Sequence, residues 1–302
     1  MTELLSVILP TYNPDATRLQ QTLAGLRQQS LPIANWELII IDNNSNPAIA
    51  IDLSWHPNYK IIREDKPGLT YARLKGLENA SGSIIVMVDD DNILDKNYLE
   101  HTLSIFNSNT ALGAIGGKSI PLFEGSPPVW LKEFYSNLAL RDLGEMPLIS
   151  SWQNEYPATA PIGAGMAIRK NAIQSYIEKI SADKNTITDR TGNSLSSGGD
   201  NDMVIEILKS GWQVGYYPEL QLTHIIPQGR MRSGYLAKLI NNTNKSWVRL
   251  LEEHQINPWP KIPRWSVPLR KIKLWFTYRA WQNNVNYIKW QGACGLYDGL
   301  SE

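Results

Sequence analysis

The sequence has little cysteine and no long apolar run, and both absences restrict where the protein can work. A single cysteine, Cys294, excludes an intrachain disulfide framework and favours a reducing compartment. No stretch approaches the roughly 18–20 apolar residues that a helix needs to cross a bilayer. Residues 1–14 also lack the basic start and the long apolar run of a signal peptide. We therefore expect a cytoplasmic protein that is soluble or peripheral at the inner face of the membrane.

The composition is that of a globular protein whose charge is unevenly spread. The chain has 302 residues, of which 42% are hydrophobic, which suits one large α/β domain or one domain with an appendage. It contains no internal repeat and no low-complexity tract. Residues 1–227 hold 17 Lys and Arg against 25 Asp and Glu, a charge of −8. Residues 228–302 hold 12 against 4, a charge of +8, and are rich in tryptophan.

Short apolar runs alternate with helical patterns in the first half of the chain. Leu4–Leu9 is an apolar run broken only by Ser6, which is typical of a buried strand. Asn13 and Pro14 then predict a helix start, with Asn13 as the N-cap and Pro14 in the first turn. Further strands are expected at Leu38–Ile41, Lys60–Arg63 and Ile84–Val88, and helices at 69–80 and 95–106. This alternation predicts an α/β fold with a mostly parallel central sheet, right-handed crossovers and flanking helices.

The second half is less regular. We expect a short helix at Pro127–Ser136, a small-residue strand at Gly163–Ile168 and a mobile polar loop at 181–199. A helix at Asp200–Lys209 and strands at Val214–Tyr217 and Leu220–Ile226 follow. Two helical patterns, at 234–254 and 268–290, predict a helical, basic, Trp-rich C-terminal extension over residues 228–302.

Polar residues follow three of the predicted strands at the points where the strands end. These residues are Thr11-Tyr12-Asn13, Asp42-Asn43-Asn44 and Asp89-Asp90-Asp91. Parallel α/β sheets bind their ligands beyond the carboxyl ends of the strands. Three separate strands therefore deliver polar groups to one edge, which predicts a binding site there.

The three consecutive carboxylates repel one another, and a divalent cation would offset that repulsion. Carboxylate oxygens suit Mg²⁺ or Mn²⁺. In an extended chain Asp89 and Asp91 point to the same side, so that one could hold the metal and the other a ribose hydroxyl or a water. The alternative is an acidic turn with a helix N-cap at Asp91 or Asn92. Taken alone, Asp42 is better explained as a turn former.

Two later features have both a structural and a catalytic interpretation. Asp200 and Asp202 begin an amphipathic helix, where they would either complement the helix dipole or supply a general base. His224 lies near the end of the last predicted strand, and a lone histidine is more often structural. Only the set of sites together favours a catalytic centre.

The order of these motifs over residues 4–227 resembles the family 2 glycosyltransferases, inverting enzymes with the A-type nucleotide-diphospho-sugar transferase fold. Asp-x-Asp alone is a weak motif, whereas seven segments in the family's order are a specific signature. The segments are Ser6–Asn13, Ile40–Ser45, Lys66–Arg73 with Gly76, Val88–Asn92, Gly163–Arg169, Gly198–Met203, and the run of Gly211-Trp212, Tyr217-Pro218 and His224.

The resemblance implies a role for each segment. Residues 1–227 would form a catalytic domain, with a nucleotide-binding half at 1–118 and an acceptor half at 119–227. The general base would be Asp200 or Asp202, because Gly199 stands where the family often has a glutamate. The ligands of a divalent metal, Mn²⁺ or Mg²⁺, would be Asp91, Asp89 and His224. The donor nucleotide would be bound by Pro10, Thr11, Tyr12, Asn13, Asp42, Asn44, Gly68, Arg73, Asp89 and Asp90.

The resemblance also implies the reaction, an inverting transfer of a sugar from a nucleotide diphosphate, by default a UDP-sugar, to an acceptor hydroxyl. A role in polysaccharide or glycoconjugate synthesis would follow, with a carbohydrate or lipid-linked acceptor and no nucleic-acid partner. A nucleotidyltransferase is one alternative, although the turn Pro10–Asn13 lacks the basic residue and the glycine of a phosphate-gripping loop. A non-catalytic nucleotide-binding or carbohydrate-binding protein is the other, and it would not need Asp200.

The C-terminal extension combines basic and aromatic residues. Basic side chains cluster at the start of the second predicted helix, at Arg270, Lys271 and Lys273. This helix either packs on the catalytic domain or contacts an anionic membrane surface through 268–290, although Gln282–Asn284 interrupts the apolar pattern. The apolar face predicted for it consists of Leu274, Tyr278, Trp281, Val285 and Ile288.

Overall fold

The computed structural model describes residues 4–182 and 198–302 of the chain. They form two compact units. The sheet unit comprises the described residues within 1–122, 139–185 and 200–225, and the helical unit those within 123–138, 186–199 and 226–302. Residues 183–197, most of the loop predicted at 181–199, lie outside the described residues.

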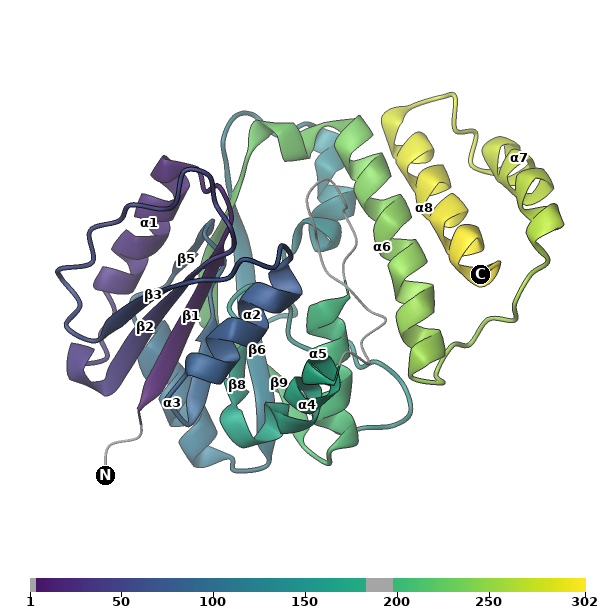
Figure 1. The fold of residues 1–302 in the computed structure, drawn as a ribbon. Helices are drawn as coiled ribbons and strands as arrows, with labels where there is room; N and C mark the ends of the chain where they lie inside the picture. The colour runs from purple at the N-terminus through teal and green to yellow at the C-terminus, as the bar shows by residue number, and fades with distance from the viewer. Residues whose placement is uncertain (1–3, 183–197) are drawn as a thin grey trace. The chain divides into compact units, whose positions relative to one another are not determined.

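A single mixed sheet organises the sheet unit (Figure 1). In the described residues its order is β3-β2-β1-β4-β8-β6-β9-β5, with β7 paired to β9. The first four strands of this order are parallel, whereas the pairs β4–β8, β6–β8, β5–β9 and β7–β9 are antiparallel. The strands are β1 (Leu5–Thr11), β2 (Trp36–Asp42), β3 (Tyr59–Arg63), β4 (Ile84–Met87), β5 (Asn92–Leu94), β6 (Leu112–Phe123), β7 (Leu148–Ser150), β8 (Ala167–Arg169) and β9 (Gln213–Ile226).

Helices cover both faces of this sheet, so its central strands have buried side chains on both sides. Every residue of β1 and β2 is buried. Helices α1 (Ala16–Arg27) and α3 (Tyr98–Ser108) share one core with Val7. Helices α2 (Leu69–Asn79), α4 (Gln174–Ser181) and α5 (Gly199–Lys209) share the other core with Ile8. Successive residues of β1 thus enter opposite cores, as the alternation along a strand requires.

Helix α1 begins later than the sequence predicted. Its N-cap is Asp15, whose carboxylate accepts hydrogen bonds from two backbone N–H groups of the first turn at 3.0 and 3.1 Å. Asn13 instead has a left-handed φ of 45°, and its N–H donates to Ser45 Oγ at 2.9 Å. The prediction that Asn13 caps the helix, with Pro14 in its first turn, is wrong because Asn13 belongs to a turn that contacts the end of β2.

Strands β5, β6 and β7 and helix α4 were not predicted. Strand β6 begins Leu-Gly-Ala-Ile-Gly-Gly, and glycine disfavours a strand when only local pattern is considered. A Cβ on Gly117 would lie 2.0 Å from the carbonyl oxygen of Leu220, so the glycine permits a close backbone approach. Strand β8 is shorter than predicted because Gly163–Met166 precedes it as a turn, and the two strands predicted over 214–226 are one strand, β9.

The helical unit contains α6 (Ser233–Glu253), α7 (Val267–Thr277) and α8 (Asn284–Leu300), with α8 between the other two (Figure 1). The single helix predicted at 268–290 is wrong. Arg279 adopts a φ of 48°, and the Asn283 side chain caps a new helix by accepting the N–H of Asn286. The helix predicted at Pro127–Ser136 is a kinked 3₁₀ helix, Val129–Leu138. None of the described helices is long and apolar enough to cross a membrane.

Glycines on one side of α8 allow it to pack closely on α6. A Cβ on Gly292 would lie 2.8 Å from Ile240 Cγ2, and one on Gly295 would lie 2.0 Å from the carbonyl oxygen of Asn241. The amide of Asn244 donates to the carbonyl of Gly292 at 3.0 Å across the same interface. The contact is therefore set by backbone proximity, and it leaves no room for a side chain at Gly295.

We predict that Gly295→Ala lowers the free energy of unfolding by about 1–3 kcal/mol, because the added methyl group overpacks the α6–α8 interface. The matched control is Gly234→Ala in α6, where a Cβ would meet no atom within 4 Å. That substitution should stabilise the protein by about 0.5–1 kcal/mol, since alanine favours a helix over glycine. Urea denaturation compares them, and equal stability of the two variants would contradict the close packing.

Candidate active site

The parallel pairing of β1 with β2 and β4 brings the predicted strand ends together. Thr11 stands opposite Asp42 in the β1–β2 ladder. The chain beyond β4 reaches Asp90, whose carboxylate accepts a hydrogen bond from the Thr11 hydroxyl. Pro10 and Thr11 are buried, whereas Tyr12 is 55% exposed. Main-chain pairing thus collects all three predicted segments at one edge of the sheet.

Asp42 is a buried carboxylate held by the turn that follows β2. It accepts hydrogen bonds from the N–H groups of Ser45 at 2.9 Å and Ile49 at 3.4 Å, and Arg63 Nη1 lies 3.4 Å away. Burial alone would raise the pKa of Asp42, but the hydrogen bonds from Ser45 and Ile49 and the charge of Arg63 outweigh it and lower that pKa. Asn44, with a φ of 64°, completes the turn by accepting a hydrogen bond from Arg63 at 2.6 Å. Asp42 therefore stays ionised and oriented at the sheet edge.

Asn43 organises the segment that leads into α2, a role that the sequence analysis missed. Its amide donates to the carbonyls of Glu64 and Lys66 at 3.2 and 2.8 Å, and its side-chain oxygen accepts the N–H of Gly68 at 2.8 Å. Gly68 has a φ of 133°, which glycine adopts without strain, and it is the N-cap of α2. The sequence offers only the pair Asn43-Asn44 after Asp42 as a signal for this role, and that pair does not reveal the hydrogen-bond partners of Asn43.

The three consecutive aspartates lie at a turn and have separate neighbours. The N–H of Asn92 donates to the carbonyl of Asp89 at 3.1 Å, so the chain here is a turn and not the extended segment that the sequence analysis assumed. Neither Asp91 nor Asn92 caps a helix, because strand β5 follows directly. Asp89 Oδ1 lies 3.7 Å from Arg73 Nη2, and that guanidinium is almost completely buried. The turn thus distributes three carboxylates among different partners.

His224 meets Asp91 because β9 pairs with β5. In this antiparallel ladder Asn92 stands opposite His224, and the N–H of Ile225 donates to the carbonyl of Asp91 at 2.9 Å. His224 Nε2 lies 3.5 Å from Asp91 Oδ1, and both side chains are about nine-tenths buried. A carboxylate oxygen and an imidazole nitrogen at this separation could both coordinate one divalent cation. The third predicted ligand, Asp89, is the ion-pair partner of Arg73.

Asp200 lies in the first turn of α5 and faces the turn that precedes β8. Its Oδ2 accepts the N–H of Gly163 at 3.0 Å. A Cβ on Gly163 would lie 2.7 Å from Arg73 Nη2 and 2.8 Å from Asp200 Oδ2, so the glycine allows both charged groups to approach the same point. Because Arg73 is also the neighbour of Asp89, the contacts link Asp200 to the carboxylate turn after β4.

Asp202 has a different environment from Asp200. Its side chain is fully buried, and its Oδ1 accepts a hydrogen bond from Lys179 Nζ of α4 at 2.7 Å. Lys179 also lies 3.4 Å from Glu206 on the next turn of α5. This ion pair ties α4 to α5 and is typical of a structural carboxylate.

Tyr156 is a further, partly buried group near Asp200, and the sequence analysis did not identify it. Its hydroxyl donates to Asn201 Oδ1 at 2.7 Å. Burial, with a smaller contribution from the charge of Asp200, raises the pKa of Tyr156 well above its ordinary value. The tyrosine is therefore a neutral hydrogen-bond donor that fixes the start of α5. No local motif marks it, because it lies in an irregular segment before the turn at Gly163.

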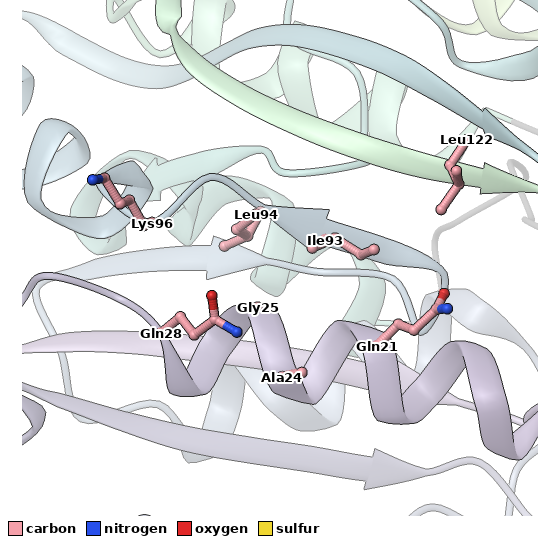
Figure 2. Close-up of a pocket in the computed structure, with 8 residues that line it drawn as sticks. All are labelled: Gln21, Ala24, Gly25, Gln28, Ile93, Leu94, Lys96 and Leu122. Carbon is pink, nitrogen blue, oxygen red and sulfur yellow. The ribbon is translucent and has the colours of Figure 1, made fainter.

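A surface depression lies between α1 and β5 and takes in none of the predicted site residues. Figure 2 shows glutamine side chains of α1 on one side of it and apolar side chains of β5 on the other. Its lining consists of Gln21, Ala24, Gly25, Gln28, Ile93, Leu94, Lys96 and Leu122. A Cβ on Gly25 would lie 2.9 Å from Ile93 Cγ2, so this depression marks the seam where α1 packs on β5.

Comparison with protein families gives this geometry its context. The glycosyl transferase family 2 profile matches residues 6–192, more than half of the chain. The chain therefore belongs to glycosyl transferase family 2. This membership confirms the predicted family and the predicted class of enzyme, a glycosyltransferase.

Two relatives with assigned names match shorter segments. The glycosyltransferase AglE of Haloferax volcanii is 33% identical over 118 residues, which cover 37% of this chain and 38% of AglE. The UDP-Glc:alpha-D-GlcNAc-diphosphoundecaprenol beta-1,3-glucosyltransferase WfgD of Escherichia coli is 30% identical over 109 residues, which cover 35% of this chain and 42% of WfgD. The match thus spans less than half the length of either relative.

A solved structure shares the fold. The crystal structure of S. aureus TarS 1–349 in complex with UDP-GlcNAc matches with a TM-score of 0.55 at 13% identity, over 99% of this chain and 90% of that chain. Likeness at this identity concerns the fold alone. It confirms the predicted A-type α/β architecture, a central sheet with flanking helices followed by C-terminal helices.

We predict that Asp42→Asn destabilises the protein in a pH-dependent way. The folded-state pKa of Asp42 is lowered. The stability it contributes is therefore fully present above its unfolded pKa of about 3.9, and is lost as the pH falls through the folded pKa. The variant should lose about 1–3 kcal/mol at neutral pH. Urea titrations at neutral pH and in acid should show the deficit shrinking as the pH falls. A deficit of constant size, or one matched by the exposed control Glu78→Gln, would contradict the assignment.

We predict that Asp91→Ala weakens Mn²⁺ binding by about 10-fold or more, because Asp91 is a candidate carboxylate ligand 3.5 Å from His224. Calorimetric titration with Mn²⁺, alone and in the presence of UDP, measures this without reference to activity. Glu78→Ala removes an exposed carboxylate of α2 and is the control. Unchanged affinity in Asp91→Ala would remove Asp91 from the metal site.

Proposed function

We propose that this enzyme transfers a sugar, with inversion, from a nucleotide diphosphate to a hydroxyl group of an acceptor. The observation that carries the proposal is the position of Asp200. Its carboxylate is fixed by the Gly163 N–H, next to the Arg73–Asp89 pair and therefore beside the strand ends that meet at one edge of the sheet. A carboxylate in this position can accept a proton from a hydroxyl group held there.

The donor nucleotide would lie over the ends of β1, β2 and β4. Asp42 is ionised and can accept hydrogen bonds from a base, while Thr11 and Asp90 form a polar pair next to it. The donor set proposed from the sequence also includes Pro10, Tyr12, Asn13, Asn44, Gly68, Arg73 and Asp89. A UDP-sugar is the donor that we propose, with support from the names of WfgD and of the TarS complex, which specify UDP-Glc and UDP-GlcNAc for those proteins.

Asp91 and His224 would hold a divalent cation, with Mn²⁺ and Mg²⁺ as the candidates. Their separation of 3.5 Å and their burial support this assignment. When bound, the cation would act as a Lewis acid that neutralises charge on the diphosphate. Asp89, as the partner of Arg73, would orient the guanidinium toward the same part of the donor.

The chemical step would be a direct displacement. The acceptor hydroxyl oxygen forms a bond to the anomeric carbon while the bond from that carbon to the diphosphate oxygen breaks. The hydroxyl proton passes to the Asp200 carboxylate, and the nucleoside diphosphate leaves with the electron pair. Attack from the opposite face converts an α-linked donor into a β-linked product. A general base contributes about 10²–10⁴-fold to such a rate, so positioning of the donor must supply much of the remainder.

Asp200 is a better candidate for the base than Asp202. A base must reach solvent or substrate, and Asp200 is partly exposed at the start of α5. Asp202 is fully buried and paired with Lys179, which makes proton exchange with an acceptor difficult.

The acceptor would be a carbohydrate or a lipid-linked sugar in polysaccharide or glycoconjugate synthesis. The name of WfgD, which specifies a diphosphoundecaprenol-linked acceptor for that enzyme, supports the lipid-linked class.

We predict that Asp200→Asn leaves UDP binding nearly intact and lowers turnover by at least about 10²-fold, the lower range for loss of a general base. Turnover is measured as hydrolysis of UDP-, GDP- and dTDP-sugars with Mn²⁺ present. Hydrolysis needs no acceptor other than water. A non-catalytic binding protein would show no such activity in any form.

Asp202→Asn is the matched comparison. It removes the negative charge that faces Lys179 but leaves Glu206, 3.4 Å from that lysine, so it should cost about 1–3 kcal/mol of stability. Turnover per folded molecule should stay close to that of the unchanged enzyme. The base assignment would move to Asp202 if that variant lost turnover with UDP binding intact while Asp200→Asn remained active.

A further inference from the structure

Helix α7 carries an exposed apolar stripe on the side away from α8. Leu269, Ile272 and Phe276 of α7 recur at spacings of three and four and so share one helical face, and Trp265 precedes them by four residues in the 3₁₀ turn Arg264–Ser266 that leads into α7. Their exposed fractions are 75% for Trp265, 63% for Leu269, 57% for Ile272 and 64% for Phe276. Trp281, 53% exposed, extends the stripe, because its ring lies 5.8 Å from that of Phe276. We call these five residues the outer face of α7.

The opposite side of α7 is packed and holds the helix in place. Lys271 Nζ lies 2.7 Å from Asp298 of α8, and the Trp290 indole donates to the Lys271 carbonyl at 3.0 Å. The rings of Trp275 and Trp290 meet edge to face at 4.7 Å. In Figure 1, α7 lies along α8 at the margin of the helical unit. The outer face is therefore presented by an anchored helix and is not needed for the packing of α7 on α8.

The segment that carries the outer face contains charges of one sign only. No Asp or Glu occurs between Glu253 and Asp298, a segment that contains seven Lys and Arg. Three of these seven pair with acids, namely Lys261 with Glu252, Lys271 with Asp298, and Lys289 with Glu133. In the part of the chain that the structure describes, the remaining four form no ion pair. They are Arg264, Arg270, Lys273 and Arg279.

We propose that the outer face of α7 docks on the surface of an anionic lipid bilayer, with the helix axis parallel to the membrane plane. Exposed tryptophans suit the headgroup level, and leucine, isoleucine and phenylalanine suit the acyl boundary below it. Basic residues that form no ion pair, in the same segment as an apolar stripe, complement anionic headgroups. This inference stands independently of the catalytic assignment, since it rests on the helical unit alone. It also differs from the face predicted from the sequence, because the break after Thr277 separates Leu274 from Val285 and Ile288, and Ile288 is buried.

The test is co-sedimentation of the full chain with vesicles of phosphatidylcholine, with and without phosphatidylglycerol, at low and high salt. We expect binding to the anionic vesicles at low salt, little to the neutral ones, and release at high salt. The double variant Ile272→Asp/Phe276→Asp should weaken binding by about 10-fold or more. Lys273→Glu should weaken it less and reduce its salt dependence.

Met146→Asp is the matched control, because Met146 is 72% exposed but lies in the sheet unit, so this variant should bind like the unchanged protein. Thermal melts and UDP binding should be unchanged in every variant, which separates loss of docking from loss of fold. The proposal is overturned if the unchanged protein stays in the supernatant at low salt, or if the Ile272/Phe276 variant sediments equally. Self-association that the same double variant abolishes, without vesicle binding, would instead assign the outer face to a second copy of the chain.

Discussion

The parallel pairing of β1 with β2 and β4 is the constraint on which the rest of the site depends. Parallel strands end at the same edge, and the ladder sets Thr11 opposite Asp42. The two apolar cores hold that ladder from both faces, so the polar ends cannot shift without disturbing buried side chains. The contact between Thr11 and Asp90 then joins the first strand end to the carboxylate turn. Every later element reaches the site by packing on this frame.

A concentration of carboxylates at one edge is costly unless each has its own partner. Asp42 is held by Arg63 and by backbone N–H groups, Asp89 by Arg73, and Asp90 by Thr11. These partners orient the carboxylates before any ligand arrives, so a ligand meets groups whose positions are already fixed. Such preorganisation lowers the reorganisation needed when charge develops on a leaving diphosphate. The same partners explain why single substitutions here should affect stability as well as binding.

Sequence pattern predicted the strands with continuous apolar runs and the edge where they end, because those features are local. It failed where a residue's role is set by a distant partner. Asparagine is favoured at helix N-caps, but the N–H of Asn13 donates to Ser45 Oγ, and Asp15 is the N-cap instead. The proximity of His224 to Asp91, which only the family resemblance implied, depends on a pairing between β5 and β9 whose register no local sequence pattern reveals. Asp200 and Asp202 look equivalent along the chain, and only burial and the contact with Lys179 separate them.

The charge of the C-terminal region leads to a final physical point. Internal ion pairs lower the local energy of charged groups but leave the net charge unchanged, so residues 228–302 keep a charge of +8 however they fold. Repulsion among these groups opposes folding, and it is weakest when an external anionic surface lies within about 10 Å, the screening length at moderate salt. The exposed apolar stripe of α7 has a second requirement, removal from water, since contact between apolar side chains and water is unfavourable. One anionic bilayer would satisfy both requirements at α7, whereas an acidic soluble partner would satisfy only the first.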